Sequence, residues 1–212
     1  MSNTALVIGS TGLIGKNLLF ELDKKDVEVI AVTRRPIRNL PDNVILLDID
    51  FDEFLENDSF PDCDHIYICL GTTIKKAGSQ SEFRKVDFDY CLAFAKKARE
   101  FGATKISFVS SIGASPSVKN FYLKTKGELE EEIKSINFAE INIFRPSLLL
   151  GHRDESRRIE KIGQNLSLLV NPFLIGPLSK YRCVKAKTVA YSMANSTPND
   201  GIRYFYYDDF LS

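Results

Sequence analysis

The feature that most constrains the fold is a glycine-rich turn near the amino terminus, Gly9-Ser10-Thr11-Gly12-Leu13-Ile14-Gly15. Its three glycines are spaced three residues apart. The apolar run Ala5 to Ile8 precedes the turn, and apolar residues at helical spacing follow it. This order predicts a strand, a tight turn and a helix, with glycines that let backbone approach a pyrophosphate. The helix N-terminus would face the phosphates, so all seven residues are candidate contacts to a nucleotide cofactor.

Composition excludes several classes of function. The 212 residues suit one large domain, and 28 basic residues balance 28 acidic ones, so no net charge draws the chain to nucleic acid or to an anionic membrane. The four cysteines form no CxxC pair, and His65 and His152 have no further ligands at metal-binding spacing. There is no secretory signal and no stretch as long as a membrane span. We expect a single-domain cytoplasmic protein without a metal.

Apolar runs alternate with helical patterns through most of the chain. A helix is predicted for residues 81–101, and a second helix follows Tyr122. Strands are predicted at residues 5–8, 28–32, 43–47, 65–70, 105–109 and 141–144, with a short strand at 181–184 and an edge strand in 203–210. This alternation predicts a doubly wound α/β fold of the Rossmann type, with a mostly parallel sheet and helices on both faces. Residues from about 150 to 212 are expected to include a small substrate lobe.

The residues after the second and fourth strands indicate which cofactor binds. Arg34 and Arg35 stand where an acidic residue would bind the ribose 2′-hydroxyl of NAD, and their forked guanidinium groups suit the 2′-phosphate of NADP. NADP is therefore expected, with NAD as the second choice, although a solvated basic loop is the simpler alternative. Leu70, Gly71 and Thr72 end a central strand, at the sheet edge where open α/β sheets bind ligands.

A tyrosine four residues before a lysine is the second strong feature. On a helix, Tyr122 and Lys126 lie on one face. An ammonium beside a phenol favours the phenolate and lowers the phenol pKa from its free value near 10, which makes the tyrosine a usable acid or base for a carbonyl and alcohol pair. Ser110 or Ser111, at the end of the preceding strand, would bind the same substrate oxygen. Lys126 also has the alternative role of binding the nicotinamide ribose.

Together these motifs resemble the extended and atypical branches of the short-chain dehydrogenase/reductase superfamily. Across residues 3 to 195 the chain is most similar to the Tat-interactive-protein oxidoreductase family. The segments that carry this resemblance are residues 69–73, 76–78, 86–87, 110–114, 120–123, 126–128 and 144–146.

The resemblance implies an NAD(P) cofactor and assigns roles to particular residues. It implies that Ser111, Tyr122 and Lys126 are catalytic, that the arginine pair binds NADPH, and that Arg145 and Pro146 pass the nicotinamide. Two positions depart from the superfamily. Asp87 stands where many members have a relay asparagine, and the serine to tyrosine interval is short, which leaves Ser110 and Ser111 both open.

The expected function is that of an NADP-dependent oxidoreductase, which transfers a hydride to or from a carbonyl or alcohol of a small organic substrate with Tyr122 as the acid/base. One alternative is a regulatory protein whose NADPH-bound form recognises a protein partner with little turnover. The apolar stretch 166–178 motivates this alternative and a possible homodimer. Another alternative is a nucleotide-sugar epimerase or dehydratase.

Overall fold

A single parallel sheet forms the centre of the computed structural model, which describes residues 3–34, 37, 39–56, 59–150, 174 and 176–211. The sheet has seven strands in the order β3-β2-β1-β4-β5-β6-β9, and every neighbouring pair is parallel. Its strands are β1 (Thr4–Ile8), β2 (Glu28–Thr33), β3 (Val44–Asp48), β4 (His65–Ile68), β5 (Lys105–Val109), β6 (Glu140–Phe144) and β9 (Gly201–Phe205). The doubly wound Rossmann-type fold predicted from the sequence is confirmed.

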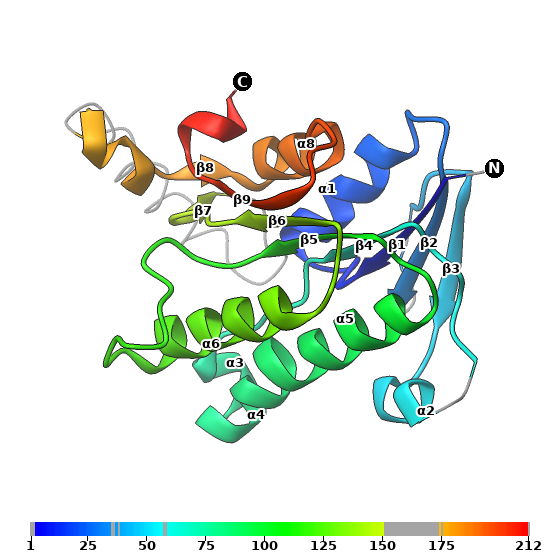
Figure 1. Ribbon diagram of the computed structural model, residues 1–212, viewed down its shortest axis with the longest axis horizontal. Helices are drawn as coiled ribbons and strands as arrows, with labels where there is room; N and C mark the ends of the chain where they lie inside the picture. Colours follow the sequence, from blue (N-terminus) through cyan, green and yellow to red (C-terminus); the bar gives the residue numbers. More distant parts are fainter. Residues whose placement is uncertain are drawn as a thin grey trace.

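Helices cover both faces of the sheet (Figure 1). The α5 and α6 layer encloses a core that includes an aromatic cluster around Phe94, and α1 and α8 enclose the other core. The helices are α1 (Leu13–Leu22), α2 (Phe51–Glu56), α3 (Ile74–Ala77), α4 (Gln80–Arg84), the π-helical turn η1 (Lys85–Asp89), α5 (Tyr90–Glu100), α6 (Phe121–Ser135) and α8 (Ala186–Asn195), with 3-10 helices η3 (Gly176–Tyr181) and η4 (Asp208–Phe210).

The register of the strands brings their carboxyl ends to one edge. Ile8 of β1 pairs with Ile68 of β4, and Ile68 pairs with Phe108 of β5. The order of the strands reverses between β1 and β4, and open α/β sheets bind ligands at such a switch point. The residues that follow these three strands therefore meet at the edge where a cofactor is expected.

The carboxyl-terminal residues differ from the sequence-based expectation. Most of the predicted substrate lobe, residues 151–173 and 175, lies outside the described residues. Beyond it, α8 packs with α1 on the main sheet and β9 extends that sheet beside β6, so these elements belong to the main layers. The predicted strand at 181–184 is wrong over most of its length, because η3 ends at Tyr181 and β8 (Val184–Lys185) pairs only with β7 (Leu149–Leu150). The expected edge strand ends at Phe205, because the chain then turns to bury Phe210 in the core.

A polar strip interrupts the α1 and α8 face of the sheet near the amino ends of the strands. The ring of His65 stacks on Tyr67 with centroids 3.9 Å apart, and its Nε2 lies 2.9 Å from the hydroxyl of Ser107. Burial, with a smaller contribution from the charge of Lys105, lowers the pKa of His65 to about 3. The imidazole is therefore neutral in the folded protein at pH values well below its usual range.

This shift predicts how stability depends on pH. Below about pH 6.5, His65 binds a proton in the unfolded chain but stays neutral in the folded chain. The contribution of His65 to the free energy of unfolding is therefore fully present above that pH and is lost as the pH drops towards 3. We expect the parent to lose about 1–2 kcal/mol more than His65→Gln between pH 7.5 and pH 5, because only the parent carries this titration. Urea unfolding at the two pH values measures the difference. Equal losses in parent and variant would contradict the prediction.

Candidate functional site

The glycine turn fits closely against the end of β4. Gly9 has a φ of +82°, and a Cβ atom there would lie 2.5 Å from the backbone nitrogen of Leu70. A Cβ atom on Gly15 would lie 2.3 Å from the carbonyl oxygen of Gly9, which leaves no room for a side chain where α1 crosses the turn. The hydroxyl of Ser10 donates to the carbonyl of Val32 in β2 and fixes the turn from the other side. The predicted contact residues of the turn and of the β4 end thus lie together.

The first turn of α1 is open to an anion. Its N-cap is Gly12, which offers no side-chain acceptor, and the turn contains no acidic residue. Backbone N–H groups of this first turn, together with the positive end of the helix dipole, are a site for phosphate. The side chain of Thr11 is exposed beside them, and those of Leu13 and Ile14 face the α1 core. Turn and helix together fit a pyrophosphate.

Arg34 follows β2 with its guanidinium over a buried aromatic ring. The guanidinium carbon lies 4.9 Å from the centroid of Phe51, while the side chain as a whole is exposed. Stacking on Phe51 would hold the guanidinium fork ready for an anion. Arg35, the other half of the predicted pair, lies outside the described residues.

Lys126 occupies a buried ion pair beneath the β4 end. Its Nζ lies 2.7 Å from Oδ1 of Asp87, and the backbone N–H of Thr72 donates to Oδ2 of Asp87 at 2.7 Å. Burial acts to lower the pKa of Lys126, but the charge of Asp87 and then that of Tyr122 act to raise it, and the net pKa is raised. A Cβ atom on Gly71 would lie 3.8 Å from Nζ, so Lys126 lies directly below this glycine. The lysine is therefore a cation at neutral pH.

Tyr122 is held in the first turn of α6, on the same helix as Lys126. Asn120 caps this helix by accepting a hydrogen bond from the N–H of Leu123 at 3.0 Å. The half-buried ring of Tyr122 packs at 5.7 Å from the ring of Phe83 in α4. The loop after β5 packs against α6 at Gly127, where a Cβ atom would lie 2.2 Å from the backbone carbon of Ser115.

The two neighbouring serines after β5 have different surroundings. Ser110 is buried, and its hydroxyl donates to the carboxylate of Glu130, which also pairs with Arg145. Ser111 is half-buried, and the one described hydrogen bond of its hydroxyl, to the carbonyl of Ile112, is long at 3.4 Å. The hydroxyl of Ser111 is therefore less engaged by the protein than that of Ser110.

Arg145 and Pro146 lie at the carboxyl end of β6, but the side chain of Arg145 is already engaged. Its guanidinium binds Glu130, donates to the hydroxyl of Tyr206 at 3.2 Å and lies over the ring of Tyr204. The carbonyl of Pro146 accepts from the N–H of Ile112 at 3.0 Å and so ties this segment to the serine loop. Contact of either residue with a nicotinamide stays a prediction.

Sequence reasoning missed two features of the site. It noted Asp87 as a departure from a relay asparagine, but the chain gives no signal that Asp87 pairs with Lys126 from a π-helical turn. The second feature is Asp50 after β3, which accepts from the N–H groups of Asp52 and Glu53 and so caps α2. Among the described residues, no group of side chains could hold a metal ion and no helix could cross a membrane.

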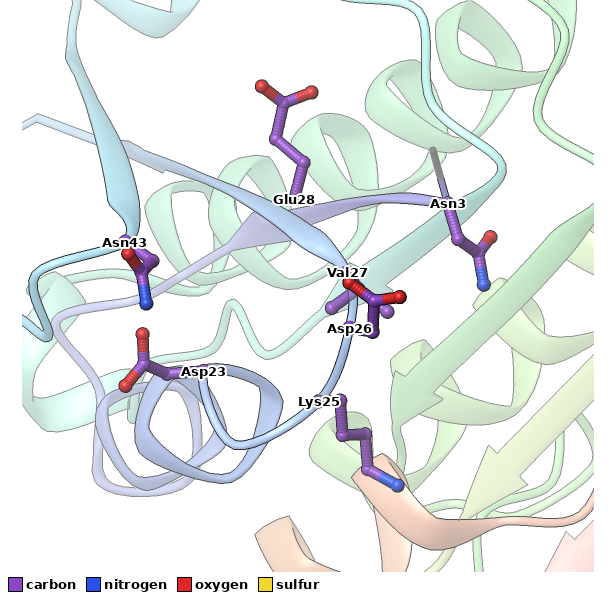
Figure 2. Close-up of a pocket in the computed structure, with 7 residues that line it drawn as sticks. All are labelled: Asn3, Asp23, Lys25, Asp26, Val27, Glu28 and Asn43. Atoms are coloured by element: carbon purple, nitrogen blue, oxygen red, sulfur yellow. The ribbon is translucent and has the colours of Figure 1, made fainter. Parts of the chain in front are cut away.

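A cavity of about 340 Å³ lies at the opposite edge of the sheet, near the amino ends of β1, β2 and β3 (Figure 2). In this view Asp23 and Asn43 point towards each other across the opening. The lining includes Asp26 and Glu28 besides Asp23, with Lys25 as its one basic member. Carboxylates at this density would repel a pyrophosphate, so this cavity does not compete with the glycine turn as the cofactor site.

Comparisons with known proteins agree with this geometry. A model described as the NAD dependent epimerase/dehydratase family matches residues 5–177. The chain is 35% identical to the protein FMP52-1, mitochondrial, of Scheffersomyces stipitis over 82% of this chain and 77% of that protein. It is 34% identical to the protein HTATIP2 of Rattus norvegicus over 74% of this chain and 66% of that protein.

Solved structures show the same fold at low sequence identity. A UDP-glucose 4-epimerase from Thermotoga maritima with UDP-glucose superposes with a TM-score of 0.70 at 16% identity, over 96% of this chain and 76% of that one. The human epimerase family protein SDR39U1 with NADPH gives a TM-score of 0.65 at 16% identity, over 96% and 74%. The chain therefore belongs to the NAD-dependent epimerase/dehydratase family, the extended branch of the short-chain dehydrogenases/reductases, whose fold binds NAD(P).

Proposed function

We propose that the protein is an NADP-dependent oxidoreductase that acts on a carbonyl or an alcohol of a small organic substrate. The observation that carries the proposal is the meeting, at one sheet edge, of the glycine turn, the β4 end and the α6 face that bears Tyr122 and Lys126. Gly9 and Gly15 have no room for a side chain and the first turn of α1 has no side-chain cap, and both features fit a dinucleotide. The cytoplasmic location of the protein and its partners stay predictions.

The chemistry is divided between the chain and its cofactor. When bound, NADPH supplies a hydride to the carbonyl carbon. In reduction, the hydroxyl of Tyr122 donates its proton to the carbonyl oxygen, which yields the alcohol, and Tyr122 regains a proton from solvent. Ser111 donates a hydrogen bond to the same oxygen and orients the substrate. Lys126 would hold the ribose of the bound cofactor, and its ammonium, which is paired with Asp87, acts on Tyr122.

The role of Tyr122 is tested by Tyr122→Phe. The variant keeps the ring that packs on Phe83 but loses the transferable proton, so we expect turnover to fall at least about 100-fold while NADPH binding is kept. NADPH oxidation against a panel of aldehydes and ketones measures turnover, and cofactor fluorescence measures binding. Equal turnover by parent and a well-folded variant would exclude Tyr122 as the acid.

The neighbouring serines provide a matched pair. We expect Ser111→Ala to lower kcat/KM at least about tenfold with little change in stability, because its hydroxyl serves the substrate. Ser110→Ala removes a buried hydrogen bond to Glu130 and is expected to cost about 1.5–3 kcal/mol in urea unfolding. The reverse outcome, with Ser111 needed for stability and Ser110 for turnover alone, would exchange the two assignments.

Cofactor preference is tested at Arg34. The Arg34→Ala variant would lose a charge-assisted hydrogen bond to the 2′-phosphate. We therefore expect it to bind NADPH about tenfold more weakly than the parent does, and to bind NADH with the same affinity as the parent. Lys96→Ala, which removes an exposed cation from α5, is the control for general charge effects. Fluorescence titration with both cofactors gives the dissociation constants. Equal loss for NADPH and NADH would refute the proposed contact to the 2′-phosphate.

A second candidate function is an NADPH-dependent regulatory protein. Large apolar side chains are exposed in the segments that follow β6, at Leu148, Leu178 and Tyr181, and exposed apolar surface marks interaction sites. Tight NADPH binding, absence of turnover on the panel and cofactor-dependent capture of a protein partner would favour this function over an enzyme.

A further inference from the structure

Asp87 is a buried carboxylate that the proposed reaction does not use. Its side chain is 1% exposed and that of its partner Lys126 is 5% exposed. One carboxylate oxygen lies 2.7 Å from Nζ of Lys126, and the other accepts from the backbone N–H of Thr72. A Cβ atom on Gly71 would lie 3.3 Å from Oδ1, so the β4 end closes over the carboxylate. Asp87 therefore joins the predicted cofactor segment to the lysine by direct contacts.

The π-helical turn η1 brings Asp87 to this place. The helix runs on from α4 through η1 into α5, since the residues on both sides of η1, Arg84 and Tyr90, have right-handed helical φ and ψ. A π-helical turn adds a residue to the helix and is frequent at functional sites. Two positions along the same turn, Asp89 is exposed. Two carboxylates of one turn thus have opposite environments.

The pairing changes the charge that Tyr122 experiences. Groups that act on Lys126 come from three elements: Asp87 from η1, Cys91 from α5 and Tyr122 from α6 itself. Of these, Asp87 is the carboxylate in contact with the ammonium. Opposite charges at 2.7 Å act on a third group nearly as a neutral pair. The positive charge of Lys126 that acts on the phenol of Tyr122 is therefore largely compensated by Asp87.

We infer that Asp87 is a positioning residue, which holds Lys126 under the β4 end and offsets its charge beside Tyr122, the acid for carbonyl reduction. The part of this inference in which Tyr122 acts as the acid rests on the proposed function. The ion pair and its effect on the ionisation of Tyr122 do not depend on turnover, and they are tested separately below.

The test compares Asp87→Asn with the matched control Asp89→Asn. Asparagine at position 87 retains an oxygen for the N–H of Thr72 but has no charge to offset Lys126. We expect the alkaline fall in kcat/KM for NADPH-dependent reduction to move about one pH unit lower in Asp87→Asn. Asp89→Asn is expected to keep the profile of the parent, because its carboxylate is exposed and in no contact with the ammonium.

A titration without substrate or cofactor separates this inference from the proposed function. Tyrosinate absorbance of the parent minus that of Tyr122→Phe isolates one of the eight tyrosines. The same difference is taken in the Asp87→Asn background, and its midpoint is expected about one pH unit lower. If no compound is reduced but the midpoint moves, the proposed function fails and the charge-offset role of Asp87 holds. An unchanged midpoint overturns the inference, whatever the turnover.

A measurement on the unaltered chain covers the case in which Asp87→Asn does not fold. A buried, paired ammonium exchanges its protons slowly, so the parent labelled with ¹⁵N should show a slowly exchanging lysine ammonium signal that Lys126→Gln lacks, whereas exposed lysines exchange fast. The presence of that signal supports the pair. Its absence at neutral pH overturns the inference.

Discussion

The structure depends on the close approach of two backbone segments at the carboxyl edge of the sheet. Gly9 and the Leu70 segment are as near as main chains allow, and Gly15 brings α1 onto the same turn. No other residue type fits at these two glycines, because any Cβ atom would overlap backbone. This contact holds the glycine turn against the β4 end, at the edge where a dinucleotide is expected.

Buried charges on α6 connect that crevice to the rest of the fold. Lys126 pairs with Asp87, and one turn later Glu130 pairs with Arg145 and receives the hydroxyl of Ser110. Buried ion pairs contribute little net stability, but removal of one partner leaves an uncompensated charge. Their effect is to fix which way α6 faces. That orientation decides where Tyr122 and the loop at Gly127 lie relative to the glycine turn.

Much of the fold was predictable because burial leaves a direct record in the sequence. The strands of a parallel sheet covered on both faces are nearly continuous apolar runs, so β1, β2, β4, β5 and β6 were found to within about a residue or two at each end. The glycine spacing predicted the turn for a similar reason, since steric exclusion permits only glycine there. The weaker pattern at residues 181–184 failed, because the 3-10 helix η3 extends to Tyr181 and only Val184 of these residues enters a strand, β8.

The site was less predictable because it depends on contacts between distant segments. Ser110 and Ser111 are indistinguishable in sequence, and only the position of Glu130 in the folded chain separates them. Asp87 likewise gives no signal of its own, since its partner comes from another helix. The contact of Arg34 with a 2′-phosphate stays a prediction from its place after β2, and the stacking of its guanidinium on Phe51 left no signal in the sequence.

Because of the π-helical turn η1, the continuous helix formed by α4, η1 and α5 does not tolerate a change in its number of residues. Deletion of one residue within η1 would restore regular α-helical phase and rotate everything after it by about 100° relative to α4. Phe94, which is fully buried in the aromatic cluster, would then leave the core, and Asp87 would leave Lys126. Core packing and site geometry therefore both depend on the number of residues in this helix. Relatives that retain both should keep this helix free of insertions and deletions, even where its exposed residues differ.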